Sequence, residues 1–157
     1  TGVRCGYTVV PKDITASTLT GERIPLNHLW YRRQCTKFNG TSYLSQRAAQ
    51  AIYTQEGKEQ VKETISYYMR NAHKMKETLT KLGLEVYGGE NAPYLWVKTP
   101  NGEGSWRFFE QMLYDAHVVC TPGVGFGPSG EGYIRLTAFG QQEKTDEALL
   151  RIENWLK

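Results

Sequence analysis

Residues 61–82 carry the pattern that most constrains the fold of this chain. Apolar side chains recur there at alternating spacings of four and three residues, which places them along one face of an α-helix. The stripe consists of Val61, Ile65, Tyr68, Ala72, Met75, Leu79 and Leu82. We expect this helix to start after Thr54, which can cap it, and to end before Gly83. Such a helix spans roughly 40 Å and can bridge two domains; a coiled coil of about three heptads is the alternative interpretation.

Two shorter helices are expected before this stripe. Asn27 is a suitable cap for a helix that runs through residue 38. Gly40 then interrupts the pattern, and Thr41 or Ser42 can begin a second helix that continues to residue 53.

The first residues predict a β-strand without a partner. Residues 5–10 are rich in Tyr, Thr and Val and are followed by Pro11, whereas residues 12–26 are polar and indicate a loop. The next strand-like segment begins only near residue 84. We therefore expect the sheet that this first strand completes to lie upstream of Thr1.

From residue 84 onward the pattern is typical of an α+β fold. Two strands are expected within residues 84–98, followed by a helix that Ser105 caps. A strand–loop–strand segment from Val118 to Phe139 comes next, and Thr145 can cap the last helix. The predicted order β-β-α-β-β-α corresponds to a layer of helices on a small sheet.

Arg135 lies in the second strand of that segment, between the apolar residues Ile134 and Leu136. A guanidinium is always charged and costs free energy to bury unpaired, so an arginine inside an apolar strand requires an anion. Its planar fork of donors matches a carboxylate through two parallel hydrogen bonds. We therefore expect Arg135 to bind a substrate carboxylate. The alternation of strand residues leaves open a second interpretation, a solvated arginine with a structural partner.

The glycine-rich loop before Arg135 matches GxGxxG at residues 125–130. A dinucleotide-binding loop of this type requires a helix N-terminus directly after the glycines. Here Pro128 interrupts the motif and a β-rich segment follows. We expect instead a tight loop whose backbone passes close to a ligand or a neighbouring segment.

Composition argues against several classes of function. The formal net charge is +3 with both signs mixed along the chain, which is unlike the basic stripe of a nucleic-acid-binding protein. No apolar run approaches the roughly 18–20 residues of a membrane span. Cys5, Cys35 and Cys120 are odd in number and widely spaced, so we expect buried, reduced thiols and a cytoplasmic location. The three histidines are isolated, and no metal site is expected.

Several long stretches of the chain resemble the C-terminal part of the LL-diaminopimelate aminotransferase family. This family belongs to the fold-type I, class I/II aminotransferases, which depend on pyridoxal 5'-phosphate. The matching stretches are TGVRCGYTVVPK at 1–12, KFNG at 37–40, VYGGENAPYLWVKTP at 86–100, SWRFF at 105–109 and TPGVGFGPSGEGYIRLTAFG at 121–140.

The resemblance assigns roles to three residues. It implies that Arg4 binds the cofactor phosphate, that Asn39 reaches cofactor and substrate in the partner subunit's site, and that Arg135 binds the substrate α-carboxylate. The Schiff-base lysine of the family lies in a Ser-x-Ser-Lys segment upstream of TGVR, so no catalytic residue is assigned here and this chain alone is expected to be inactive.

The resemblance also implies an architecture and a reaction. Residues 1–31 would be the last strand and loop of the large cofactor-binding domain, and residues 32–157 the connecting helices and the small α+β domain. The expected enzyme is a cytoplasmic homodimer with shared active sites that interconverts LL-diaminopimelate and tetrahydrodipicolinate with 2-oxoglutarate and glutamate, in lysine biosynthesis. The alternatives are an aminotransferase for aspartate, alanine or aromatic amino acids, and a non-catalytic dimerisation or binding module of the same fold.

Overall fold

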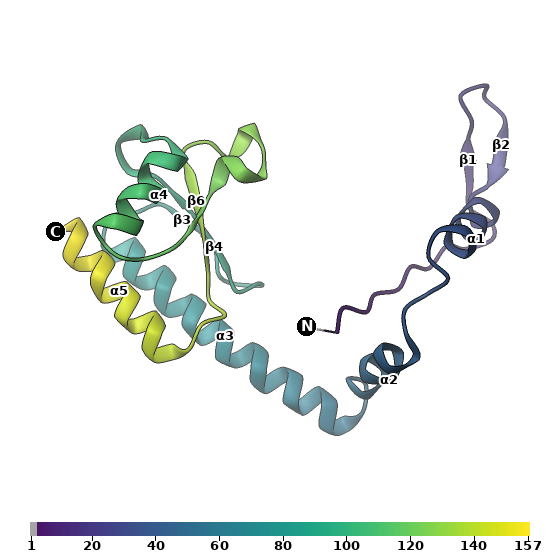
Figure 1. The fold of residues 1–157 in the computed structure, drawn as a ribbon, viewed down its shortest axis with the longest axis horizontal. Coiled ribbons are helices and arrows are strands. Elements are labelled where there is room, and N and C mark those ends of the chain that lie inside the picture. The colour runs from purple at the N-terminus through teal and green to yellow at the C-terminus, as the bar shows by residue number, and fades with distance from the viewer. Residues whose placement is uncertain (1–2) are drawn as a thin grey trace. The chain divides into compact units, whose positions relative to one another are not determined.

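The computed structural model describes residues 3–157 of the chain, so Thr1 and Gly2 of the TGVR segment lie outside the described residues. The chain divides into two compact units, Thr1–Val61 and Lys62–Lys157 (Figure 1). The long helix α3, Gln55–Lys81, begins in the first unit and continues in the second.

The first unit opens with a short antiparallel hairpin. Strands β1, Thr15–Ser17, and β2, Arg23–Pro25, pair with Thr15 opposite Pro25, where the sequence had indicated a loop. The hairpin forms because residues 18–21 close a turn, in which the amide of Gly21 donates to the carbonyl of Thr18 at 3.0 Å.

The sequence predicts at residues 5–10 a strand whose sheet lies upstream of Thr1, and this strand stays a prediction. These residues pair with no strand among residues 3–157 and carry no regular secondary structure. Strand propensity reports how well a side chain packs on a sheet, and no neighbouring strand is available to these residues here.

Two helices follow the hairpin, α1 at Leu26–Lys37 and α2 at Tyr43–Ala51. Asn27 does not cap α1, because it lies inside the first turn and its side-chain amide donates to the carbonyl of Val10 at 2.6 Å. Ser42 does cap α2, since its hydroxyl accepts from the amide of Ser45 at 3.3 Å.

Both predicted ends of α3 are confirmed. The hydroxyl of Thr54 accepts from the amide of Gly57 at 3.0 Å. At the other end, Gly83 has φ 85° and the amide of Leu84 donates to the carbonyl of Leu79 at 3.1 Å. This is the left-handed termination that a glycine after the last turn favours.

The second unit contains a four-stranded antiparallel sheet in the order β3-β4-β6-β5. The strands are β3 at Val86–Gly88, β4 at Tyr94–Lys98, β5 at Thr121–Pro122 and β6 at Tyr133–Thr137. With α4 at Ser105–Tyr114 and α5 at Gln142–Leu156, the predicted order β-β-α-β-β-α is confirmed.

Two of the helix caps in this unit differ from the predictions. α4 begins at Ser105 with Gly104 as its N-cap, and the Ser105 hydroxyl donates to the carbonyl of Gly130 at 3.1 Å instead. α5 begins at Gln142, so Thr145 lies in its first turn and donates to the carbonyl of Gln141 at 3.1 Å. The carbonyl that Ser105 contacts is 25 residues away in the sequence, whereas Thr145 bonds to the carbonyl four residues before it, within the same helix turn.

The core lies between one face of the sheet and helices α3, α4 and α5, and Figure 1 shows α3 and α5 running side by side. Its largest members are Leu79, Leu95, Phe108, Met112 and Ile134. Only the C-terminal half of the predicted stripe is buried, because Ala72, Met75 and Leu79 are at most 6% exposed whereas Ile65 is 54% exposed.

The expected burial of all three cysteines is wrong for two of them, since Cys5 and Cys35 are exposed and only Cys120 is buried. The first two lie in the first unit, where no side chain among residues 3–61 is buried. Among residues 3–157, no helix combines the length and apolar character that crossing a bilayer requires.

Candidate active site

Arg135 lies in β6, between β4 on one side and β5 on the other. It is opposite Trp96 of β4 and Thr121 of β5. Its neighbours Ile134 and Leu136 are buried in the core, so the alternation of the strand turns Arg135 to the opposite face of the sheet, where it is half-buried.

The Arg135 guanidinium contacts aromatic rings and has no acidic partner in the described chain. Its central carbon lies 4.5 Å from the ring centroid of Phe126 and 5.0 Å from that of Tyr94. No acidic side chain among residues 3–157 forms an ion pair with it, and its buried Nε makes no hydrogen bond. A partly buried cation without an acidic partner costs free energy unless an anion pairs with it, so the binding of a carboxylate by Arg135 stays a prediction.

The face of the sheet around Arg135 is aromatic. Trp96 stacks on Tyr133 with a centroid distance of 5.6 Å and also meets the edge of Phe126 at 5.8 Å. On the other side, Tyr94 meets the edge of Phe139 at 5.2 Å. These rings exclude water from the flanks of the guanidinium, which strengthens its interaction with a carboxylate.

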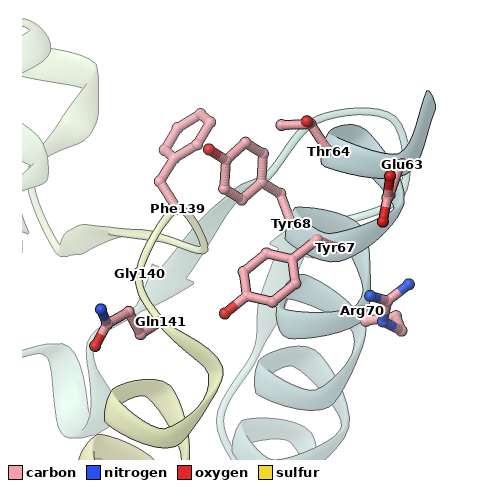
Figure 2. A pocket seen from close by; sticks show the side chains of 8 residues that line it. All are labelled: Glu63, Thr64, Tyr67, Tyr68, Arg70, Phe139, Gly140 and Gln141. Atoms are coloured by element: carbon pink, nitrogen blue, oxygen red, sulfur yellow. The ribbon is translucent and has the colours of Figure 1, made fainter. Parts of the chain in front are cut away.

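A groove of about 370 Å³ begins beside Phe139. Figure 2 shows Phe139 next to Tyr68 of α3, and the two rings meet edge to face at 5.0 Å. The hydroxyl of Tyr67 accepts from the amide of Gln142 at 2.7 Å, which ties the start of α5 to α3. The groove therefore has an aromatic wall that continues toward Tyr94.

Sequence reasoning did not single out Asn71, a buried residue of α3 that is 2% exposed. Its side-chain amide donates to the carbonyls of Ala138 and Gly140, at 3.3 and 2.9 Å. These carbonyls belong to the segment that follows β6, so Asn71 fixes the end of the strand that carries Arg135. The feature of the sequence that could have identified Asn71 is its position, directly before Ala72 of the apolar stripe.

The glycine-rich loop forms two 3-10 turns, Gly123–Phe126 and Pro128–Gly130, and then enters β6. A strand follows the glycines, as expected, so the helix N-terminus that a dinucleotide-binding loop requires does not come directly after this motif. A Cβ on Gly123 would lie 2.6 Å from the carbonyl oxygen of Tyr133 and closer still to that of Gly130. The loop therefore closes only with glycine at this position.

Arg4 and Asn39 lie in the first unit. Arg4 is exposed, has φ 55° and lines a pocket of about 390 Å³ with Ala48 and Ala49 of α2 and with Ile52, which follows that helix. An exposed guanidinium at a pocket supplies the donors that a phosphate requires. The left-handed backbone of Arg4 is unusual for a residue with a Cβ and indicates a local constraint at this position.

Asn39 follows the end of α1, where φ is 65° at Asn39 and 106° at Gly40. Asparagine tolerates this left-handed conformation better than most residues. The side chain is exposed and projects from a turn between α1 and α2. Among residues 3–157, no group of three His, Cys, Asp or Glu side chains is placed to hold a metal ion.

Residues 1–152 match the family model described as aminotransferase class I and II. The chain belongs to this family. An LL-diaminopimelate aminotransferase of Bacteroides fragilis (strain YCH46) is 76% identical over 156 residues, which are 99% of this chain and 38% of that protein. The chain therefore spans about 38% of the length of such curated relatives.

Two solved structures place the fold in the same family. The L,L-diaminopimelate aminotransferase from Chlamydomonas reinhardtii is 40% identical with a TM-score of 0.84, and the match covers 93% of this chain and 35% of that one. An aromatic aminotransferase from Pyrococcus horikoshii OT3 is 29% identical with a TM-score of 0.70, over 78% of this chain and 34% of that one. The chain is thus a mixed α/β part of a fold-type I aminotransferase structure.

Proposed function

We propose that this chain is the C-terminal part of an LL-diaminopimelate aminotransferase that acts in lysine biosynthesis. The complete enzyme would interconvert LL-diaminopimelate and tetrahydrodipicolinate, with 2-oxoglutarate and glutamate as the second pair. The observation that carries the proposal is the half-buried Arg135, which has no acidic partner among residues 3–157, on the sheet of a chain 76% identical to a protein of that name.

Arg135 would bind the α-carboxylate through two parallel hydrogen bonds. Both the amino acid and the oxo acid carry this group, so one arginine serves both halves of the reaction. The aromatic face around the guanidinium limits its hydration and the number of orientations that it can adopt.

Arg4 and Asn39 are proposed to hold the cofactor. The exposed guanidinium of Arg4 fits the phosphate of pyridoxal 5'-phosphate, and Asn39 would reach cofactor and substrate in the partner subunit's site. When bound, this cofactor supplies an electron sink for the transfer of an amino group. The Schiff-base lysine would be contributed by a segment upstream of Thr1.

The proposal includes an assembly. Residues 1–31 would complete the large cofactor-binding domain, and residues 32–157 would form the connecting helices and the small domain. The enzyme would be a cytoplasmic homodimer whose active sites are shared between subunits, since Asn39 serves the site of the partner. An enzyme for aromatic substrates is the second candidate, because the Pyrococcus horikoshii aromatic aminotransferase has the same fold over 78% of this chain.

The deciding experiment is Arg135→Lys in the complete enzyme. Lysine keeps the charge but loses the two-pronged geometry, so a loss of ~2–3 kcal/mol should lower kcat/KM about a hundredfold in both half-reactions. Melting temperature and cofactor absorbance should stay near those of the wild type. The wild type should prefer LL-diaminopimelate over aspartate, alanine and phenylalanine. A lower melting temperature with normal kinetics would assign Arg135 a structural role and contradict the proposal.

A further inference from the structure

The two rings that contact Arg135 come from different parts of the second unit. Tyr94 is the first residue of β4, two positions before Trp96, which lies opposite Arg135. Phe126 is the last residue of a 3-10 turn in the glycine-rich loop. We call Tyr94 and Phe126 the aromatic clamp. Neither ring is needed to fill the core, because Tyr94 is 41% and Phe126 53% exposed.

The position of Phe126 is set by the closure of its loop. The backbones of Gly123 and Gly130 are in close contact, and a Cβ on either residue would collide with the carbonyl of the other. Gly127, directly after Phe126, has φ 125°, a conformation that L side chains rarely adopt. Three glycines therefore hold the turn that places the Phe126 ring over the guanidinium.

The end of the loop is tied to α4. The Glu131 carboxylate accepts from the amide of Ser105 at 2.8 Å, and the Ser105 hydroxyl accepts from the amide of Tyr133 at 3.3 Å. Phe126 of the clamp thus lies in a loop whose C-terminal end is fixed to α4, whereas Tyr94 lies in strand β4. A ring held in this way costs little additional ordering when a ligand arrives.

These contacts suit the recognition of a carboxylate. An aromatic face attracts a guanidinium through its quadrupole and removes water from its surface, without consuming any of its N–H donors. The guanidinium therefore stays fixed and poorly hydrated while its terminal N–H groups remain free for an anion. An acidic partner in the same place would also fix the side chain but would compete with the substrate for these donors.

We propose that Tyr94 and Phe126 are positioning residues that orient Arg135 for a substrate carboxylate, and that the glycine-rich loop exists to place Phe126. The proposal deepens the proposed function and rests on it for the identity of the substrate. The property under test is the affinity of Arg135 for a carboxylate, which can be measured without turnover.

The experiment uses the complete enzyme loaded with cofactor and the variants Phe126→Leu, Phe126→Tyr, Tyr94→Leu and Tyr94→Phe. Calorimetry gives the dissociation constant of glutarate, a dicarboxylate that cannot react. Each leucine variant should weaken glutarate binding about tenfold and raise KM for 2-oxoglutarate by a similar factor, with kcat little changed. Phe126→Tyr and Tyr94→Phe keep a ring and should restore both values. Trp106→Leu removes an exposed ring of α4 and serves as the matched control.

The outcomes separate this proposal from the proposed function. Equal glutarate affinity in wild type and both leucine variants would overturn the clamp, even if the enzyme transaminates. Weakened glutarate binding in an enzyme that turns over no amino acid would support the clamp and overturn the proposed function. If a leucine variant melts well below Trp106→Leu, the test passes to Phe126→Tyr and Tyr94→Phe. If these variants are stable but do not bind glutarate with the affinity of the wild type, the clamp is overturned.

Discussion

Arg4 and Arg135 both lack an acidic partner among residues 3–157, and the resemblance assigns an anionic ligand to each of them. Lysines 74, 76, 98, 144 and 157 and Arg151 each have such a partner. A cation that is left without an intramolecular anion beside a pocket or an aromatic surface keeps its donors for a ligand. The two arginines are therefore where binding should be sensitive to substitution.

Replacement of Arg4 by alanine in the complete enzyme should weaken retention of pyridoxal phosphate. The charge-assisted bond to the phosphate contributes about 1.5–3 kcal/mol, so the dissociation constant should rise by roughly 10- to 150-fold. Dialysis followed by cofactor absorbance measures the loss. Arg47→Ala on the exposed surface of α2 is the control, and equal retention in both variants would remove Arg4 from the phosphate site.

Cys120 should resist thiol reagents that modify the other two cysteines. Burial raises its pKa to about 12, and the side chain is 8% exposed. The reactive species is the thiolate, so at pH 8 Cys120 offers almost none of it, whereas Cys5 and Cys35 are exposed. Alkylation with peptide mapping should label those two in the folded chain and Cys120 only after denaturation. Labelling of Cys120 at a comparable rate would show that β5 opens easily.

For single residues, the sequence predicted the kind of ligand that a side chain requires better than it predicted which other side chains contact that residue. The prediction that Arg135 requires an anion follows from its charge and its apolar neighbours; no acidic side chain among residues 3–157 pairs with it, and the binding itself stays a prediction. The contact with Phe126 could not be predicted, because it depends on the path of a glycine-rich loop that contains three left-handed or crowded glycines. The roles of Arg4 and Asn39 were assigned from the family resemblance, and they stay predictions.

Helix α3 shows which element-level features local sequence determines. Its apolar period, the Thr54 cap and the Gly83 termination are all properties of nearby residues, and the structure confirms them.

The failed caps at Asn27, Ser105 and Thr145 have a common cause. Each side chain bonds to a backbone carbonyl instead, and for Asn27 and Ser105 that carbonyl is distant in the sequence. The strand at residues 5–10 stays a prediction, because a strand requires a neighbour and none pairs with it among residues 3–157.

Asn71→Ala should destabilise the packing of α3 against the segment after β6. The substitution leaves the carbonyls of Ala138 and Gly140 without their donor in a buried site, which costs about 1–3 kcal/mol. Urea denaturation should show this loss in the free energy of unfolding with an unchanged slope. Asn154→Ala, on the exposed surface of α5, should change stability by less than about 0.5 kcal/mol. Equal stability of the two variants would show that water replaces the Asn71 amide.

At the scale of the whole molecule, the two units differ in how many apolar side chains each of them buries. Among residues 3–157, all of the buried apolar side chains lie between Ala72 and Ile152, in the second unit. The described part of the first unit, residues 3–61, has no side chain in the buried class and exposes large apolar residues, including Leu29, Trp30, Tyr43 and Leu44. A segment that buries so little apolar surface gains little stability from its own fold.

This difference predicts separate behaviour of the two units in the isolated 157-residue chain. Limited proteolysis should cleave within residues 3–61 first, because local opening there costs little free energy, and should leave a resistant product that contains residues 62–157. In the complete enzyme the same bonds should be protected, since the proposed cofactor domain and partner subunit would cover the exposed apolar side chains.

The isolated chain should also incorporate no pyridoxal phosphate at a single lysine after borohydride reduction and should not transaminate, because the proposed Schiff-base lysine is upstream. Turnover by the isolated chain, or equal protease resistance of its two units, would contradict the assignment of residues 1–31 to a domain that the rest of the enzyme completes.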